Sequence, residues 1–122
     1  MTKRILVIDD SASMRQLLAA TLLDAGYAVV EAADGRDALA QLSAQRIHLA
    51  VCDVNMPVMD GLSFVKEVRK HADFRFLPII MLTTESSEDR KEEGQIAGAR
   101  AWVVKPFRPE QILRAVEKLI LA

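Results

Sequence analysis

The side chains best suited to chemistry in this chain each follow directly on a short apolar run. Asp9 and Asp10 follow the first run, Asp53 the third, Thr83 the fourth and Lys105 the fifth. Three carboxylates held together repel one another unless a cation joins them, and their oxygens suit Mg²⁺. A carboxylate can also attack phosphorus to form an aspartyl phosphate, while an ammonium and a hydroxyl can hold phosphoryl oxygens. Together, these groups indicate a site for phosphoryl transfer.

Taken one at a time, each of these groups has a simpler explanation. A lone aspartate after a strand usually caps a helix or a turn, and a lone threonine there is usually a turn residue. A lone lysine is usually a solvated charge. The functional interpretation therefore requires that all of these groups meet at one edge of a sheet.

Five apolar runs that alternate with helical patterns could bring the groups together. The runs indicate buried strands at residues 4–8, 28–32, 49–52, 79–82 and 101–104. Apolar residues at helical spacing predict helices over residues 14–25, 35–42, 61–69, 87–97 and 109–120, and on the first of them the spacing includes Leu17, Leu18 and Leu22. This alternation predicts a parallel sheet with helices on both faces, and the carboxyl ends of its strands share one edge.

Composition limits the class of protein. A chain of 122 residues that is 51% hydrophobic and 27% charged is expected to form one soluble domain over residues 1–122. A net charge of −1 offers no broad basic surface for nucleic acid or anionic lipid. The single cysteine, Cys52, excludes an internal disulfide and fits a reducing compartment. No apolar run approaches the ~20 residues of a membrane span and no signal peptide is evident, so a cytoplasmic location is expected.

The predicted helix over residues 87–97 differs from the others. It offers only Ile96 as a large apolar anchor and contains Gly94, which costs roughly 1 kcal/mol relative to alanine. A solvated surface helix would have this composition, and so would an element that switches between conformations.

The ordered set of polar residues resembles a known family over essentially the whole chain. The residues that carry the resemblance are Asp9-Asp10, Asp53 followed by Met56-Pro57 and Gly61, Thr83, and Lys105-Pro106-Phe107. This order resembles the receiver domain of two-component response regulators, most of all the single-domain chemotaxis regulators. The resemblance implies an α/β fold of the (βα)5 flavodoxin-like type, with three layers and a five-stranded parallel sheet in the strand order 2-1-3-4-5.

The resemblance also implies roles for the residues at the strand ends. Asp53 would accept a phosphoryl group from a sensor histidine kinase, in the manner of the chemotaxis kinases. Asp9, Asp10 and Asp53 would bind Mg²⁺ together with the backbone carbonyl of Asn55, and Lys105 would pair with a phosphoryl oxygen. The protein's own chemistry would then be limited to Mg²⁺-dependent self-phosphorylation and self-dephosphorylation, so it would not be an enzyme in the usual sense.

The remaining implications concern signal output. The bond before Pro106 would be cis, Thr83 would move toward the phosphoryl group, and Trp102 would swing inward. This motion would change the face made by the fourth helix, the fifth strand and the fifth helix, where a partner such as the flagellar motor switch binds. Asn55 and Glu85 would flank the path of the attacking water and set the phosphoryl lifetime. A monomer, with a phosphatase as a further partner, is expected.

Other classes of protein fit the sequence less well. A phosphohydrolase of the haloacid-dehalogenase type needs a second aspartate two residues after the nucleophile, where this chain has Asn55. A flavin carrier needs phosphate-binding donors after the first strand, where Asp9 and Asp10 would repel a phosphate. A structural adaptor would not require the aligned strand ends. Within the resembled family, a phosphorelay shuttle or a phosphate sink is the alternative to a chemotaxis switch.

Overall fold

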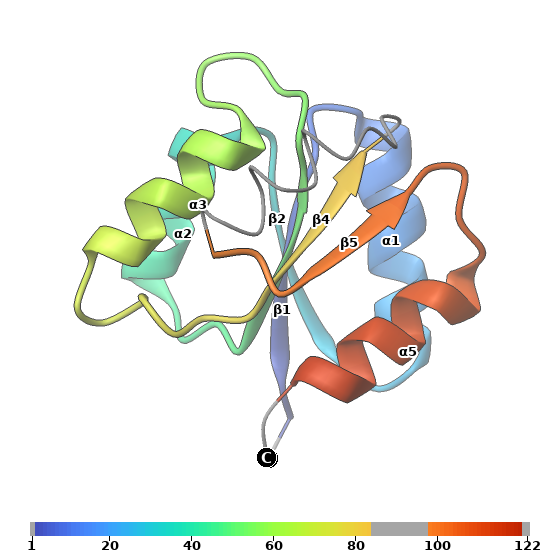
Figure 1. Cartoon of the computed structure of the whole chain (residues 1–122). Helices are drawn as coiled ribbons and strands as arrows, with labels where there is room; N and C mark the ends of the chain where they lie inside the picture. Colours follow the sequence, from blue (N-terminus) through green and yellow to red (C-terminus); the bar gives the residue numbers. More distant parts are fainter. Residues whose placement is uncertain (1, 84–97, 121–122) are drawn as a thin grey trace.

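The computed structural model describes residues 2–83 and 98–120. Over these ranges the chain forms a five-stranded sheet with helices on both of its faces (Figure 1). The strands are β1 (Arg4–Ile8), β2 (Ala28–Ala32), β3 (Leu49–Asp53), β4 (Ile79–Thr83) and β5 (Ala101–Val104). The helices are α1 (Ala12–Asp24), α2 (Gly35–Ala44), α3 (Gly61–Lys70) and α5 (Pro109–Leu119).

The strand order is β2-β1-β3-β4-β5, and every neighbouring pair is parallel, which confirms the predicted fold. The inner strands β3 and β4 are buried along their whole length, whereas the edge strands β2 and β5 are mostly half-buried. Since all five strands run in one direction, their carboxyl ends lie at the same edge of the sheet.

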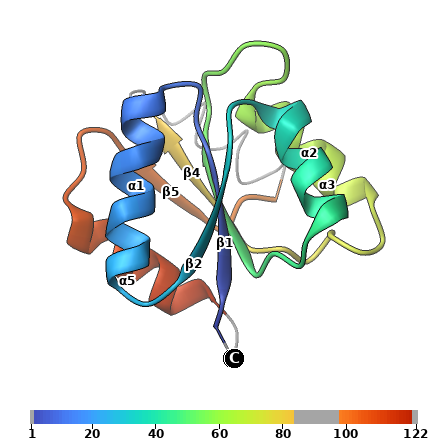
Figure 2. The same ribbon diagram turned by 180° about the vertical axis from the view of Figure 1, so that it is seen from behind.

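The sheet separates two apolar cores. Along β3, Leu49 and Val51 pack with residues of α1 and α5, whereas Ala50 and Cys52 pack with residues of α2 and α3. This alternation follows from the two-residue period of a strand, and it requires both sets of positions to be apolar. Figure 2, seen from behind, shows α1 and α5 on one side of the sheet and α2 and α3 on the other.

Short polar residues begin the helices close to the strand ends. Ser11 caps α1 by accepting a hydrogen bond from the backbone N–H of Met14 at 3.3 Å. Asp34 and Asp60 cap α2 and α3 in the same way, each at 2.8 Å. These caps satisfy backbone N–H groups that the first helical turn leaves without partners. They therefore stabilise the first turn of each of these three helices.

Gly61 allows α3 to start directly against the end of β3. Its backbone N–H donates to the carbonyl of Val54 at 2.9 Å. A Cβ at this position would lie 2.8 Å from Met81 Cε and 2.9 Å from Val54 Cα, and it would also contact the carbonyl oxygen of Asp53. A larger residue would push α3 away from the strand that carries Asp53.

Helix α1 differs from its prediction at one position. Leu18 and Leu22 are only 1% and 0% exposed, but Leu17 is 51% exposed. Residues four apart lie on one face of a helix, whereas a neighbouring residue is turned by about 100°. Leu18 and Leu22 therefore occupy the face that packs on the sheet, and Leu17 lies to the side of it.

The predicted helix over residues 87–97 lies outside the described residues, and so does Glu85. Within the described ranges, no helix is long and apolar enough to cross a lipid bilayer.

Candidate functional site

The carboxyl edge of the sheet brings together the polar residues singled out in the sequence. Asp9 follows β1 directly, Asp53 ends β3, Thr83 ends β4, and Lys105 follows β5. Asp9, Asp53 and Thr83 are 1%, 6% and 0% exposed, whereas Asp10 is exposed. Buried polar groups at the ends of apolar strands are costly unless they find partners, so their interactions show how the site is built.

Lys105 connects two strands of the site. Its Nζ lies 3.2 Å from Asp9 Oδ2 and 3.4 Å from Asp53 Oδ1, and its side chain is only 16% exposed. These contacts join residues that are 96 and 52 positions apart in the sequence. The peptide bond between Lys105 and Pro106 is cis, as predicted.

The three carboxylates form a cluster that suits a divalent cation. One oxygen from each of Asp9, Asp10 and Asp53 lies within 4.8 Å of the others. When ionised, these groups carry three negative charges, of which the ammonium of Lys105 neutralises one, so two remain. Mg²⁺ carries two positive charges, takes carboxylate oxygens and retains several waters, for which the exposed side of Asp10 leaves room. The donor set therefore fits Mg²⁺.

The surroundings of Asp53 disfavour its charge. Burial raises the pKa of the Asp53 carboxyl above its ordinary value of 3.8, and the nearby Asp9 raises it further. Lys105 and the backbone N–H of Asn55, which donates to the carboxylate, oppose this rise without cancelling it. A bound cation would lower the cost of keeping Asp53 ionised, and an ionised carboxylate is the nucleophilic form.

Asp9 is held by the backbone as well as by Lys105. The N–H of Ser11 donates to Asp9 Oδ1 at 2.9 Å, which fixes the carboxylate from the start of α1. Arg15 Nη1 donates to the backbone carbonyl of Asp9 at 2.6 Å, and Arg15 Nε lies 3.3 Å from Glu31 Oε1. The sequence does not indicate the contact of Arg15 with Asp9, because a bond to a backbone carbonyl leaves no signature in residue types.

Thr83 and Asn55 lie at or closely after the carboxyl ends of the neighbouring strands β4 and β3. Thr83 is fully buried on the strand next to β3, and its carbonyl accepts from the backbone N–H of Lys105 at 2.7 Å. Asn55 is exposed and follows β3 by two residues. Glu85, the other residue expected beside the attacking water, lies in the stretch that the structure does not describe.

Trp102 lies on the α2–α3 side of β5. It is half-buried and packs against the core cluster that contains Phe64, Leu77 and Met81. Its indole Nε1 is buried and finds no hydrogen-bond partner within the described ranges. A buried indole N–H usually has a partner, and none of residues 2–83 and 98–120 supplies one here.

Cys52 and His48 take no part in the site chemistry. Cys52 is fully buried, its Sγ donates to the carbonyl of Asp53 at 3.3 Å, and burial raises the pKa of its thiol well above the ordinary value. It is therefore an unreactive core residue. His48 Nδ1 accepts from the backbone N–H of Arg4 at 2.9 Å, at the amino ends of β1 and β3. Burial lowers the pKa of His48, so it is an uncharged structural residue.

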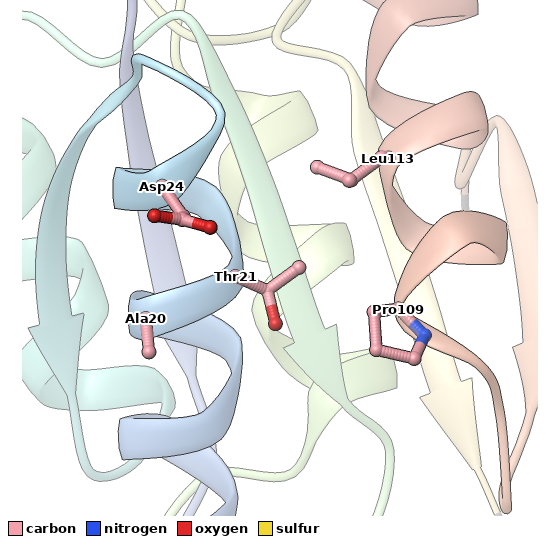
Figure 3. A pocket seen from close by; sticks show the side chains of 5 residues that line it. All are labelled: Ala20, Thr21, Asp24, Pro109 and Leu113. Carbon is pink, nitrogen blue, oxygen red and sulfur yellow. The ribbon is translucent and has the colours of Figure 1, made fainter.

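A pocket of about 440 Å³ lies elsewhere, between α1 and α5. Figure 3 shows its lining side chains: Ala20, Thr21 and Asp24 from α1, and Pro109 and Leu113 from α5. None of the residues of the carboxylate cluster lines it, so its position does not compete with the strand-end site.

Comparison with known proteins places this geometry in a family. Residues 5–117 match the family model described as the response regulator receiver domain. The Vibrio cholerae chemotaxis protein CheY4 has a similar structure, with a TM-score of 0.94 and 48% sequence identity over 98% of this chain and 100% of that one.

Curated relatives include both short and long proteins. The chemotaxis protein CheY1 of Helicobacter pylori is 38% identical, and the match covers 96% of each chain. The probable transcriptional regulator ycf27 of Porphyridium aerugineum is 41% identical over 95% of this chain but only 50% of its own length. The chain therefore spans about half the length of the ycf27 relatives and nearly all of CheY1.

Proposed function

The chain belongs to the response regulator receiver domain family, and we propose that it is a phosphorylation-controlled switch whose phosphoacceptor is Asp53. The observation that carries this proposal is the placement of Lys105 Nζ, 3.2 Å from Asp9 and 3.4 Å from Asp53, beside three clustered carboxylates. This arrangement supplies a nucleophile, a positive charge for phosphoryl oxygens and a donor set for Mg²⁺.

The proposed chemistry takes place at the Asp53 carboxylate. An oxygen of Asp53 attacks the phosphorus of a phosphohistidine on the donor kinase, the new O–P bond forms, and the P–N bond breaks with its electrons returning to the imidazole. Lys105 moves from its contact with the carboxylate to a phosphoryl oxygen, since the two positions are adjacent. Later hydrolysis transfers the phosphoryl group to water and restores the carboxylate.

The proposed metal ligands are the side chains of Asp9, Asp10 and Asp53 with the backbone carbonyl of Asn55. When bound, Mg²⁺ neutralises charge on the phosphoryl oxygens. Asp9 and Asp53 lie in the buried part of the cluster and Asp10 at its exposed rim, so the protein holds the ion from one side and leaves the other to water and donor.

The proposed output route runs from Thr83 to Trp102. Thr83 pairs in register with Val104, and Met81 pairs with Trp102, so both residues lie on the paired strands β4 and β5. Movement of the Thr83 hydroxyl toward the phosphoryl group opens space that the Trp102 ring can enter. The face that includes β5 and α5 then changes, and a partner selects the changed conformation.

The proposed biological role is in chemotaxis, in the cytoplasm, with a histidine kinase upstream and the flagellar motor switch downstream. The near-complete coverage of CheY1 and CheY4 supports this role. The matches to ycf27 regulators leave a different output partner as the second candidate. Asn55 and Glu85 are proposed to set the lifetime of the phosphorylated state, and a dedicated phosphatase would shorten it.

The decisive experiment is phosphorylation from acetyl phosphate with and without Mg²⁺, followed by peptide mass spectrometry. Modification of Asp53 that requires Mg²⁺ and is absent in Asp53→Asn is expected. Asp73→Asn is the matched control, because Asp73 is exposed and lies between α3 and β4, away from the carboxylate cluster. Phosphate on another residue, or none with any donor, would refute the assignment.

The output route has its own test. Beryllofluoride, which mimics the aspartyl phosphate, should change Trp102 fluorescence in the wild type and in Asp73→Asn, but not in Asp53→Asn. If Asp53 is phosphorylated but the fluorescence of Trp102 does not change, the role of Trp102 is refuted. The assignment of Asp53 as the phosphoacceptor would still hold. Binding of the phosphorylated chain to a motor-switch protein, compared with the unphosphorylated chain, tests the chemotaxis role.

A further inference from the structure

We propose that Arg15 is a positioning residue that orients Asp9 and Asp10 for binding of the divalent cation. This inference rests on the proposed function, because it concerns the metal ligands of the same site. Arg15 lies on the first turn of α1, and its side chain is 20% exposed. It belongs neither to the carboxylate cluster nor to the groups around the Asp53 carboxylate.

Arg15 donates a hydrogen bond to the backbone carbonyl of Asp9. Its Nη1 donates to that oxygen at 2.6 Å, which is a short, charge-assisted hydrogen bond. Its Nε lies 3.3 Å from Glu31 Oε1 on β2, so the guanidinium is oriented by a second strand. The side chain thus joins α1, the end of β1 and β2 at the edge where the metal ligands lie.

The bond to the Asp9 carbonyl controls the next residue. A peptide unit is planar, so fixing the carbonyl of Asp9 also fixes the direction in which the chain enters Asp10. The other polar groups of Asp9 already have partners: its N–H donates to the carbonyl of Ala32 at 3.1 Å, Ser11 N–H holds Oδ1, and Lys105 contacts Oδ2. Within the described ranges, the side chain of Asp10 has no hydrogen bond of its own. Its direction therefore depends on the peptide that Arg15 holds.

If Arg15 orients the metal ligands, its loss should change the Mg²⁺ affinity in the direction opposite to the one expected from charge alone. Removing a positive charge beside a carboxylate cluster should strengthen the binding of a cation if charge alone mattered. Loss of a residue that orients metal ligands instead weakens binding, typically by 10-fold to 100-fold. Arg15→Met should therefore raise the Kd for Mg²⁺ by roughly 10-fold or more. Glu31→Gln should raise it less, because Arg15 keeps its bond to Asp9 but loses its anchor.

Metal binding and phosphorylation should respond differently to the loss of Arg15. Arg15 contacts neither Asp53 nor Lys105, so the phosphorylation rate of Arg15→Met at saturating Mg²⁺ should stay within about twofold of the wild type. Only the Mg²⁺ concentration for half-maximal rate should rise. Arg15→Lys should recover part of the affinity, since a lysine can donate to one of the two oxygens but not fork between both. A general loss of stability would not raise the Mg²⁺ concentration for half-maximal rate while leaving the rate at saturating Mg²⁺ unchanged.

The experiment is calorimetric titration of each variant with MgCl₂, together with phosphorylation rates over a range of Mg²⁺ concentrations. Arg36→Met is the matched control, because Arg36 is exposed near the start of α2 and lies outside the cluster. A raised Kd in Arg15→Met, with Arg36→Met unchanged, would support the proposal. An unchanged or lowered Kd would overturn it.

Two outcomes need a second measurement. If thermal unfolding shows that Arg15→Met does not fold, Arg15→Lys decides, because it keeps the positive charge and removes only the forked contact: a raised Kd supports the proposal and an unchanged Kd overturns it. If the wild type binds no Mg²⁺ and Asp53 is never phosphorylated, the proposed function fails. If instead the wild type binds Mg²⁺ and is phosphorylated on Asp53, but Arg15→Met has the same Kd for Mg²⁺, only the role of Arg15 fails.

Discussion

Replacing Asp53 with asparagine should stabilise the metal-free protein while abolishing phosphorylation. Asparagine has nearly the same shape as aspartate but no charge, so the substitution removes the electrostatic interactions of the carboxylate and leaves packing almost unchanged. Asp53 is 6% exposed, and burial and Asp9 both raise the pKa of its carboxyl. The folded protein therefore holds the ionised Asp53 at a cost that asparagine avoids.

The size of this cost follows from the distances in the site. At the upper limit of 4.8 Å between their oxygens and an effective dielectric of about 20, each of Asp9 and Asp10 repels an ionised Asp53 by about 3.5 kcal/mol. Lys105, at 3.4 Å, attracts it by about 5 kcal/mol. Asp10 is exposed, so solvent screens much of its share. The charge interactions therefore nearly cancel, and the desolvation of the buried carboxylate, the largest cause of its raised pKa, decides the sign. A net gain of about 1 to 2 kcal/mol is expected, which for 122 residues raises Tm by roughly 4 to 8 °C.

Thermal and urea unfolding in the presence of a chelator would measure this gain, with Asp73→Asn as the control. Because the pKa of Asp53 is raised in the folded state, the stability difference should be absent below pH 3.8 and grow as the pH rises through the folded-state pKa. Added Mg²⁺ should stabilise the wild type more than Asp53→Asn. If Asp53→Asn were no more stable than the wild type at neutral pH without metal, burial and repulsion by Asp9 would not outweigh the attraction of Lys105.

Two further substitutions test the geometry of the site. Lys105→Met should tighten Mg²⁺ binding by roughly tenfold, the equivalent of 1.4 kcal/mol, because the ammonium and the ion compete for the same oxygens of Asp9 and Asp53; weaker binding by calorimetry would contradict this. Gly61→Ala should cost about 1 to 3 kcal/mol in urea unfolding, since its methyl group would meet the backbone at the end of β3, namely the carbonyl oxygen of Asp53 and Val54 Cα at 2.9 Å. An unchanged unfolding midpoint would show that α3 shifts without cost.

The strands were predictable because their apolar runs end in residues that break the pattern. All five described strands agree with the predicted runs to within one residue, and Asp53 and Thr83 prove to be the last residues of β3 and β4. Leu17 shows the limit of such patterns. Helical spacing alone groups it with Leu18, but the sheet covers only one side of α1, and Leu17 is 51% exposed.

Residue types and strand ends are local properties, so the amino-acid sequence is enough to identify the chemical groups of the site and the order in which the strands present them. It also contains Gly61, where α3 approaches the end of β3 too closely for a side chain. Which of these groups come into contact depends on the folded arrangement of the strands and helices. The contact of Lys105 with Asp9 joins residues 96 positions apart. The hydrogen bond from Arg15 to the backbone carbonyl of Asp9 depends on how α1 is placed relative to the end of β1. Such contacts arise from the packing of helices on a sheet, and no residue pattern encodes them separately.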